Sequence, residues 1–86
     1  MTYTVVLLPT AERGLAKLPP AAQSAIMKEL RRLEVEPRHR GVLPVRSEPG
    51  WLRARVGDFR VVFAIDDRGG RVVVKHVVRR DKAYRD

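Results

Sequence analysis

The sequence contains no cysteine, and only 6% of its residues are aromatic. Without cysteine there is no disulfide framework, no thiolate metal ligand and no thiol nucleophile, and a reducing compartment fits. No apolar run approaches the length of a membrane span, and no charged segment followed by an apolar one indicates a signal peptide. Metal-ligand spacing, paired carboxylates and a glycine-rich phosphate loop are missing too. We therefore expect a cytoplasmic protein that uses no membrane, metal or cofactor.

Negative charge is also scarce. The 86 residues include 18 Lys and Arg against 10 Asp and Glu, which gives a net charge of +8 and a pI near 11.1. This balance predicts a polyanionic partner, with nucleic acid as the first candidate and an acidic protein as the second. Most of the cations are arginine, which favours bidentate phosphate contacts, although a genome rich in G and C would also favour arginine. With 44% hydrophobic residues, the chain 1–86 is expected to form one small domain.

The segment 51–65 predicts a β-hairpin around which the rest is organised. Gly57-Asp58 suits a type II′ turn, and apolar residues alternate on both sides of it. Val56 then pairs with Phe59, and Arg55 faces Arg60. One face of the hairpin is apolar, and the other carries Arg53, Arg55 and Arg60. Like charges directly opposite each other are unfavourable, which indicates that an anion neutralises them.

The flanking segments predict an α+β fold. Residues 2–8 form a first strand, and Thr10 caps a helix over 11–18. Pro20 opens a second helix that ends near Glu36, so that a helical hairpin covers one face of a sheet. A long loop over 37–50 leads into the hairpin, and residues 71–78 form the last strand. The expected fold is an N-terminal strand, a helical hairpin and a three-stranded antiparallel meander in one sheet, with the helices on one face.

The register of the last strand decides which side chains join the arginine face. Pairing Phe59, Val61, Phe63 and Ile65 with Val72, Val74, His76 and Val78 buries apolar residues and places Lys75 and Arg79 beside the arginines. His76 is then a packed or edge residue, and His39 is exposed in the long loop. Trp51 is interpreted as an anchor at the start of a strand, with base stacking as the alternative. The residues Lys28, Glu29, Arg31, Arg32, Glu34 and Glu36 form a solvated helix face.

The basic set suits one reaction, the cleavage of RNA. The 2′-hydroxyl of RNA is its own nucleophile, so the protein must only accept that proton, stabilise the charge on phosphorus and protonate the leaving oxygen. Arginines stabilise the charge, and a C-terminal tyrosine, Tyr84, accepts the proton if neighbouring cations lower its pKa. A surface that only binds phosphate or an acidic protein remains the alternative. The residues concerned are Arg53, Arg55, Arg60, Lys75, Arg79, Arg80 and Tyr84.

Residues 55–67, RVGDFRVVFAIDD, and 76–85, HVVRRDKAYR, resemble the RelE branch of the RelE/ParE toxin superfamily. The resemblance implies a bacterial type II toxin with a microbial-ribonuclease-like fold, which enters the ribosomal A site and cleaves mRNA to a 2′,3′-cyclic phosphate. It implies that a cognate antitoxin neutralises it in a hetero-oligomer. By position, the catalytic residues are Arg53, Arg55, Arg60, Arg80 (or Arg79) and Tyr84, and the expected RNA contacts are Lys75, Arg79, Arg85 and Trp51. A ParE-like protein that inhibits gyrase without cutting RNA is the alternative.

Overall fold

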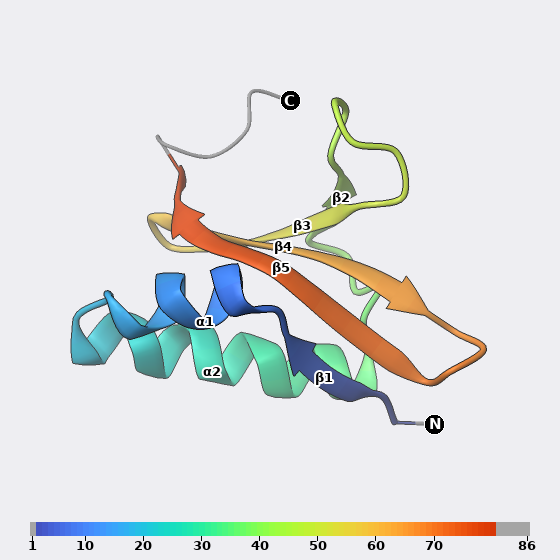
Figure 1. The fold of residues 1–86 in the computed structure, drawn as a ribbon, viewed down its shortest axis with the longest axis horizontal. Helices are drawn as coiled ribbons and strands as arrows, with labels where there is room; N and C mark the ends of the chain where they lie inside the picture. The colour runs from blue at the N-terminus through green and yellow to red at the C-terminus, as the bar shows by residue number, and fades with distance from the viewer. Residues whose placement is uncertain (1, 81–86) are drawn as a thin grey trace.

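The computed structural model describes residues 2–80 and shows an α+β fold built on one sheet. Both helices lie on the same side of the sheet (Figure 1), as predicted. The strands are arranged in the order β1-β5-β4-β3-β2. In chain order, the elements are β1 (Thr4–Leu7), α1 (Pro9–Ala16), α2 (Pro20–Val35), β2 (Val42–Pro44), β3 (Leu52–Val56), β4 (Phe59–Asp66) and β5 (Arg71–Arg79).

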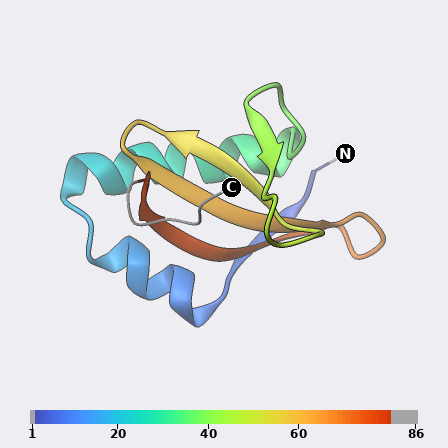
Figure 2. The ribbon, with the colours of Figure 1, turned by 90° about the horizontal axis from the view of Figure 1, so that it is seen from above.

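The sheet is mixed, because β1 joins it in the parallel sense. Thr4 is paired with Arg71 and Leu7 with Val74, so the first and last strands lie side by side. Between these two strands the chain forms both helices and then β2, β3 and β4, which is the long connection that a parallel pair requires. The predicted antiparallel meander is β3-β4-β5, which crosses over the helices in Figure 2.

The expectation that residues 37–50 are only a loop is wrong, because β2 lies within them and pairs with β3. This strand has three residues, and it ends at Pro44. Proline is tolerated there because β2 is the edge strand and its outer side needs no hydrogen bond. So short a strand has no alternation long enough to detect in the sequence.

The helix starts depend on proline. α1 begins at Pro9, and its N-cap residue Leu8 makes no side-chain hydrogen bond, so the predicted cap at Thr10 is wrong. α2 begins at Pro20 and ends at Val35, as the sequence predicts. Proline fixes φ near the helical value and lacks the N–H that the first turn would leave unsatisfied, so it starts a helix without a side-chain cap.

The main core fills the space between the sheet and the helices. Phe63, Ile26 and Leu33 are its largest fully buried side chains. Each buried side chain of this size stabilises the fold by about 1.5–3 kcal/mol. The predicted helical stripe is confirmed at Ile26, Leu30 and Leu33. No helix within residues 2–80 has the length and apolar character needed to cross a membrane.

The predicted β3–β4 hairpin is confirmed in every pair. Val56 is paired with Phe59, Arg55 with Arg60 and Arg53 with Val62. Gly57 has a φ of 57°, whereas no residue other than glycine has a positive φ among those described, as a type II′ turn at Gly57-Asp58 requires. The turn therefore fixes which side of the sheet the three arginines occupy.

Candidate functional site

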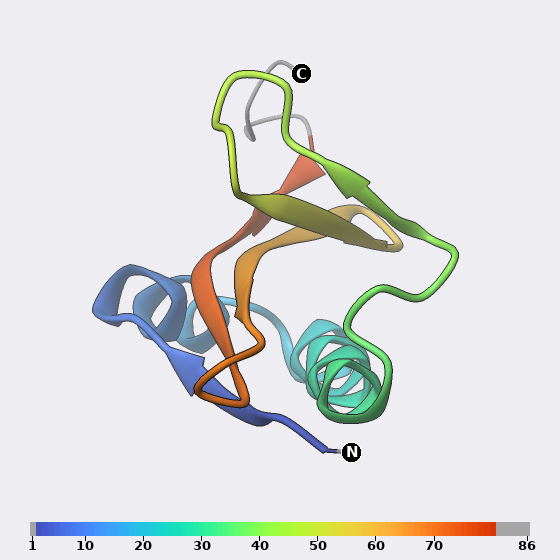
Figure 3. The ribbon, with the colours of Figure 1, turned by 90° about the vertical axis from the view of Figure 1, so that its right-hand side faces the viewer.

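The side of β3, β4 and β5 that faces away from the helices is called the open face here; it carries Arg53, Arg60, Val62 and His76. Arg53 and Arg60 are half-buried. Val62 is fully buried although it lies outside the main core cluster. The loop that follows β2 stands on this side of the sheet (Figure 3), so this part of the sheet has its own cover. The guanidinium groups consequently lie at a partly desolvated surface, where electrostatic interactions are stronger than in water.

Arg55 has a different environment from the other two arginines. It pairs with Arg60 across the hairpin, but its side chain is exposed. β2 reaches only as far as Ala54 along β3, so Arg55 lies where β3 has no strand beside it. Here it lines a groove of about 600 Å³ against α2, together with Lys28, Arg31 and Arg32. The three hairpin arginines thus divide into two half-buried groups on the open face and one exposed group at the sheet edge.

A β-bulge changes the predicted register of β5. Phe63 pairs with Val74 as expected, but Val62 pairs with His76, and Lys75 is the additional residue between them. A bulge inserts one residue and reverses the faces of everything that follows. Val77, fully buried in the core, therefore takes the place that the alternation assigns to His76. The expectation that His76 and Val78 lie on the apolar face is wrong.

Lys75 fastens the loop after β2 to the open face. Its Nζ forms an ion pair with Glu48 Oε1 and lies 4.6 Å from the centre of the Trp51 ring. The loop is closed by backbone bonds from Val45 N–H to the Trp51 carbonyl oxygen and from Trp51 N–H to the Glu48 carbonyl oxygen. Lys75 lies on the arginine face, as predicted. The Trp51 ring makes a cation–π contact with its ammonium group. Glu48 was missed because nothing in a loop sequence marks which carboxylate folds back onto a strand.

His76 is the second residue of the open face that sequence reasoning assigned wrongly. Burial lowers the pKa of its imidazole, the neighbouring Lys75 ammonium lowers it further, and Glu48 partly opposes both. The uncharged form is therefore favoured at neutral pH. The bulge could not be read from the sequence, because Val77 and Val78 fit the apolar face equally well.

Arg79 and Arg80, the two candidates for the catalytic arginine at the end of β5, have different environments. Arg79 pairs with Phe59, and its guanidinium lies 5.9 Å from the centre of that ring. It therefore lies on the helix side, beside Arg13 and Lys17 in a groove of about 620 Å³, so its predicted place on the arginine face is wrong. Arg80 is exposed, and its N–H donates to the Asp58 carbonyl oxygen at 2.8 Å. Tyr84 and Arg85 lie outside the described residues.

The loop histidine His39 is buried, contrary to the prediction that it is exposed. Its Nε2 lies 2.6 Å from Glu29 Oε2, and its Nδ1 accepts a hydrogen bond from Gly41 N–H. Because Nδ1 accepts, Nε2 carries the proton and donates to the carboxylate. Glu29 is thus not part of a merely solvated helix face, since it fixes the start of the long loop to α2.

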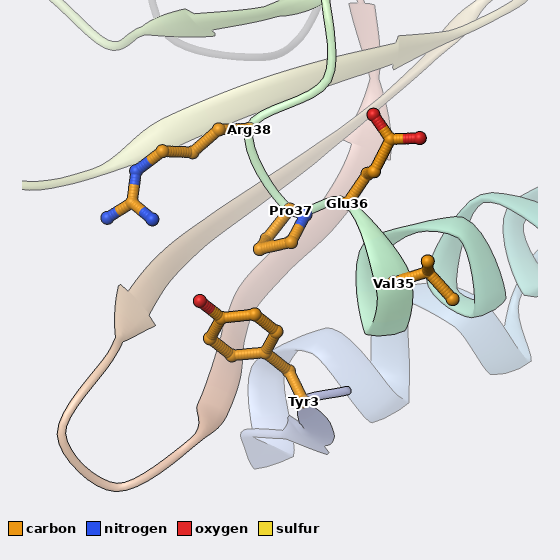
Figure 4. A pocket seen from close by; sticks show the side chains of 5 residues that line it. All are labelled: Tyr3, Val35, Glu36, Pro37 and Arg38. Carbon is orange, nitrogen blue, oxygen red and sulfur yellow. The ribbon is translucent and has the colours of Figure 1, made fainter. Parts of the chain in front are cut away.

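A pocket of about 360 Å³ lies at the other end of the sheet, between Tyr3 and the end of α2 (Figure 4). Asp67 ties its rim together: Tyr3 OH donates to Oδ1 at 2.7 Å, and Arg38 donates to both carboxylate oxygens. These groups join the start of β1, the residues after α2 and the β4–β5 turn. Within residues 2–80, no three His, Asp or Glu side chains are grouped as metal ligands. These hydrogen bonds hold the three segments together and lie far from the hairpin arginines Arg53, Arg55 and Arg60. They are called the Asp67 clamp.

Comparison with known proteins places the chain in a family. Residues 5–84 match the sequence profile of the ParE toxin of the type II toxin–antitoxin system parDE. The chain belongs to this toxin family. It is 38% identical to Toxin RelE of Mycobacterium tuberculosis over 84 residues, covering 96% of the chain and 87% of the relative. It is 39% identical to Toxin RelG of the same organism over 87 residues, covering 99% of each.

A solved structure agrees with this assignment. The fold matches the toxin–antitoxin complex RelBE2 from Mycobacterium tuberculosis with a TM-score of 0.83 and 38% identity, covering 93% of this chain and 100% of that one. The RelE-type toxin fold expected from the resemblance is therefore confirmed. The protein is a type II toxin whose named relatives are of the RelE kind.

Proposed function

We propose that this toxin is a ribosome-dependent endoribonuclease that cleaves mRNA in the A site. The observation that carries the proposal is the pair of half-buried guanidinium groups, Arg53 and Arg60, on adjacent strands of the open face. Two fixed cations at a partly desolvated surface are suited to a phosphate whose negative charge grows during the reaction. The named relatives, RelE and RelG, support the RelE-type reading over the gyrase-inhibiting one.

The proposed reaction is a displacement within the RNA, in which the 2′-hydroxyl gives up its proton to a general base. The 2′-oxygen attacks the adjacent phosphorus, the bond to the 5′-oxygen breaks, and the products are a 2′,3′-cyclic phosphate and a 5′-hydroxyl. Arg53 and Arg60 stabilise the charge that develops on the phosphoryl oxygens. Arg80, at the end of β5, is positioned by its bond to the Asp58 carbonyl and serves as a further phosphate ligand. Arg55, exposed at the sheet edge, contacts the RNA backbone beside the cleavage point.

We also propose that an antitoxin encoded beside this toxin neutralises it in a hetero-oligomer. One relative of known structure is a complex of toxin with antitoxin. A net charge of +8 favours a partner segment rich in acidic residues, lying across the open face or over the end of β5. Such a segment excludes RNA from Arg53 and Arg60.

Primer extension on a defined mRNA in a purified translation system tests the nuclease proposal. The unmodified protein is expected to produce stops within the A-site codon only when ribosomes are present. Arg60→Ala is expected to lower the cleavage rate by about 10²–10³, the usual loss when one group that stabilises a transition state is removed. The matched control is Arg68→Ala, an exposed arginine in the β4–β5 turn, which should cleave at the unmodified rate.

An intact message with the unmodified protein would overturn the nuclease proposal. A gyrase supercoiling assay would then test the ParE-like alternative, which the name of the matching family keeps relevant. Equal cleavage by Arg60→Ala would instead show that the half-buried arginine pair is not the reacting centre.

A further inference from the structure

We propose that His76 is the general base that takes the proton from the attacking 2′-hydroxyl. This inference rests on the proposed RNA cleavage and adds the one role that arginines cannot fill. A guanidinium stays protonated at any physiological pH, so Arg53, Arg55 and Arg60 accept no proton. An unperturbed tyrosine has a pKa of about 10, so it is almost fully protonated at neutral pH. An imidazole is uncharged near neutral pH without such a shift, and the open face carries one, His76.

The bulge at Lys75 places His76 in the row of side chains that contains Arg53. Val62 is paired with Arg53 on one side and with His76 on the other. Neighbouring strands lie about 4.8 Å apart, so Arg53 and His76 have their Cα atoms about 10 Å apart across Val62. An imidazole and a guanidinium extending from these positions can contact the ribose and the phosphate of one nucleotide. Val62 between them is fully buried, so it is covered by neighbouring side chains.

Arg60 occupies the next row on the same face. Its partner on β5 is Val78, two residues beyond His76. His76 therefore has one phosphate-binding arginine in its own row and another diagonally beside it. Within the described strands His76 is the only histidine, so it is the only imidazole on these strands beside a phosphate held by Arg53 and Arg60.

The charged groups around His76 suit a base. Lys75 precedes it and holds the Glu48 carboxylate and the Trp51 ring, so Lys75 is committed to the loop. Burial and the Lys75 charge keep the imidazole uncharged, while Glu48 stabilises the imidazolium that forms when it accepts a proton. A base that is neutral before the reaction and tolerated as a cation after it is the requirement for this step.

Proton transfer to His76 accompanies the displacement at phosphorus. The 2′-oxygen forms a bond to phosphorus while an imidazole nitrogen of His76 takes its proton, and the bond from phosphorus to the 5′-oxygen breaks. The leaving oxygen takes a proton from water, and the imidazolium later returns its own proton to water. No electron is transferred to or from the protein, and no co-reactant is required. The next turnover begins with the same uncharged imidazole.

Single-turnover cleavage on programmed ribosomes, measured from about pH 5 to about pH 9, tests the inference. The unmodified rate should rise with pH and level off once His76 is deprotonated. His76→Gln keeps hydrogen-bonding capacity but cannot take the proton, so it should cleave about 10²–10⁴-fold more slowly and lose that rise. Ribosome binding and the urea midpoint of His76→Gln should equal those of the unmodified protein. Added imidazole should restore part of the rate.

A substrate with sulfur in place of the leaving 5′-oxygen separates the two proton transfers. The sulfur leaves without a proton, so a general acid is no longer needed, whereas a general base still is. His76→Gln should therefore stay slow on this substrate; recovery to the unmodified rate would overturn the assignment and make His76 the acid. Cleavage by His76→Gln within about threefold of the unmodified rate, with the same pH profile, would overturn it entirely. If the unmodified protein cleaves no RNA, the proposed function is wrong, and this inference is wrong with it.

Discussion

At the scale of single residues, Gly14 shows how tightly α1 packs on β5. A Cβ atom at this position would lie 2.2 Å from the Val77 carbonyl oxygen, well inside van der Waals contact. That oxygen belongs to β5, which has a strand on each side, and it cannot move without disturbing those neighbours. Glycine is therefore required here by close approach of the backbones.

Replacing this glycine should destabilise the protein. We expect Gly14→Ala to lower the free energy of unfolding by about 1–3 kcal/mol, because the helix must move away from β5. Urea denaturation followed by far-ultraviolet circular dichroism measures the change. The control is Gly41→Ala, whose Cβ would meet nothing closer than 3.4 Å, at the His39 ring. Equal midpoints for the two variants would contradict the close approach.

Some side-chain contacts of the candidate site could be predicted from the sequence, and others could not. The positions of Arg53, Arg55 and Arg60 follow from strict alternation about one turn, and the structure agrees with each pair. His39 and Glu48 could not be placed, because their partners Glu29 and Lys75 are distant in the chain and no local pattern links them. Side-chain pairs formed by folding a loop back onto an element are set by tertiary packing alone.

At the scale of elements, Asp67 joins three segments that are far apart in the sequence. Hydrogen bonds from Arg38 and from Tyr3 lower the pKa of the Asp67 carboxyl to about 2. In the unfolded chain the pKa of an aspartate is about 3.9. The folded state thus binds the proton less tightly than the unfolded state. The clamp stabilises the fold above about pH 4, and its contribution is lost as the pH falls toward 2.

Removing the charge of Asp67 should therefore matter only above that range. We expect Asp67→Asn to have a lower melting temperature than the unmodified protein at about pH 6, and the difference should close by about pH 2. Differential scanning calorimetry at both pH values measures it. Asp58→Asn, in the turn at the opposite end of β4, makes the same charge change away from the clamp and is the control. A gap that persists at about pH 2 would show that the carboxylate charge is not what Asp67 contributes.

The elements themselves were largely predictable, for identifiable reasons. Pro20 marks the start of α2, and the apolar spacing of Ile26, Leu30 and Leu33 fixes its buried side. The register of β5 was predictable only up to Val74. Beyond it, consecutive valines satisfy either face, so the bulge at Lys75 leaves no trace in the pattern. The residue that the bulge turns outward, His76, is the one on which the proposed chemistry depends.

At the scale of the whole molecule, the net charge of +8 governs how partners approach. A long-range positive field raises the rate at which an anionic partner associates, and salt screens it. We expect the association rate with the antitoxin to fall about tenfold or more between about 0.05 M and about 0.5 M salt, with a smaller change in the dissociation rate.

Stopped-flow measurement of both rate constants tests this expectation. Sucrose at matched osmolality serves as the control, because it changes the solvent without screening charge. An association rate that does not respond to salt would mean that apolar contact, and not the charge of the toxin, brings the two proteins together.

β5 lies between β1 and β4, and it is the last of the strands to be synthesised. While the chain is still being translated, β1 has no neighbour, and the open face has Arg53 and Arg60 but neither Lys75 nor His76 beside them. A fragment that stops in the β4–β5 turn thus carries the cations without the assembled surface, because pairings so distant in sequence form only when both strands exist. On the proposed function, unfinished copies of this toxin are inert, and a cell becomes exposed to it only one completed molecule at a time.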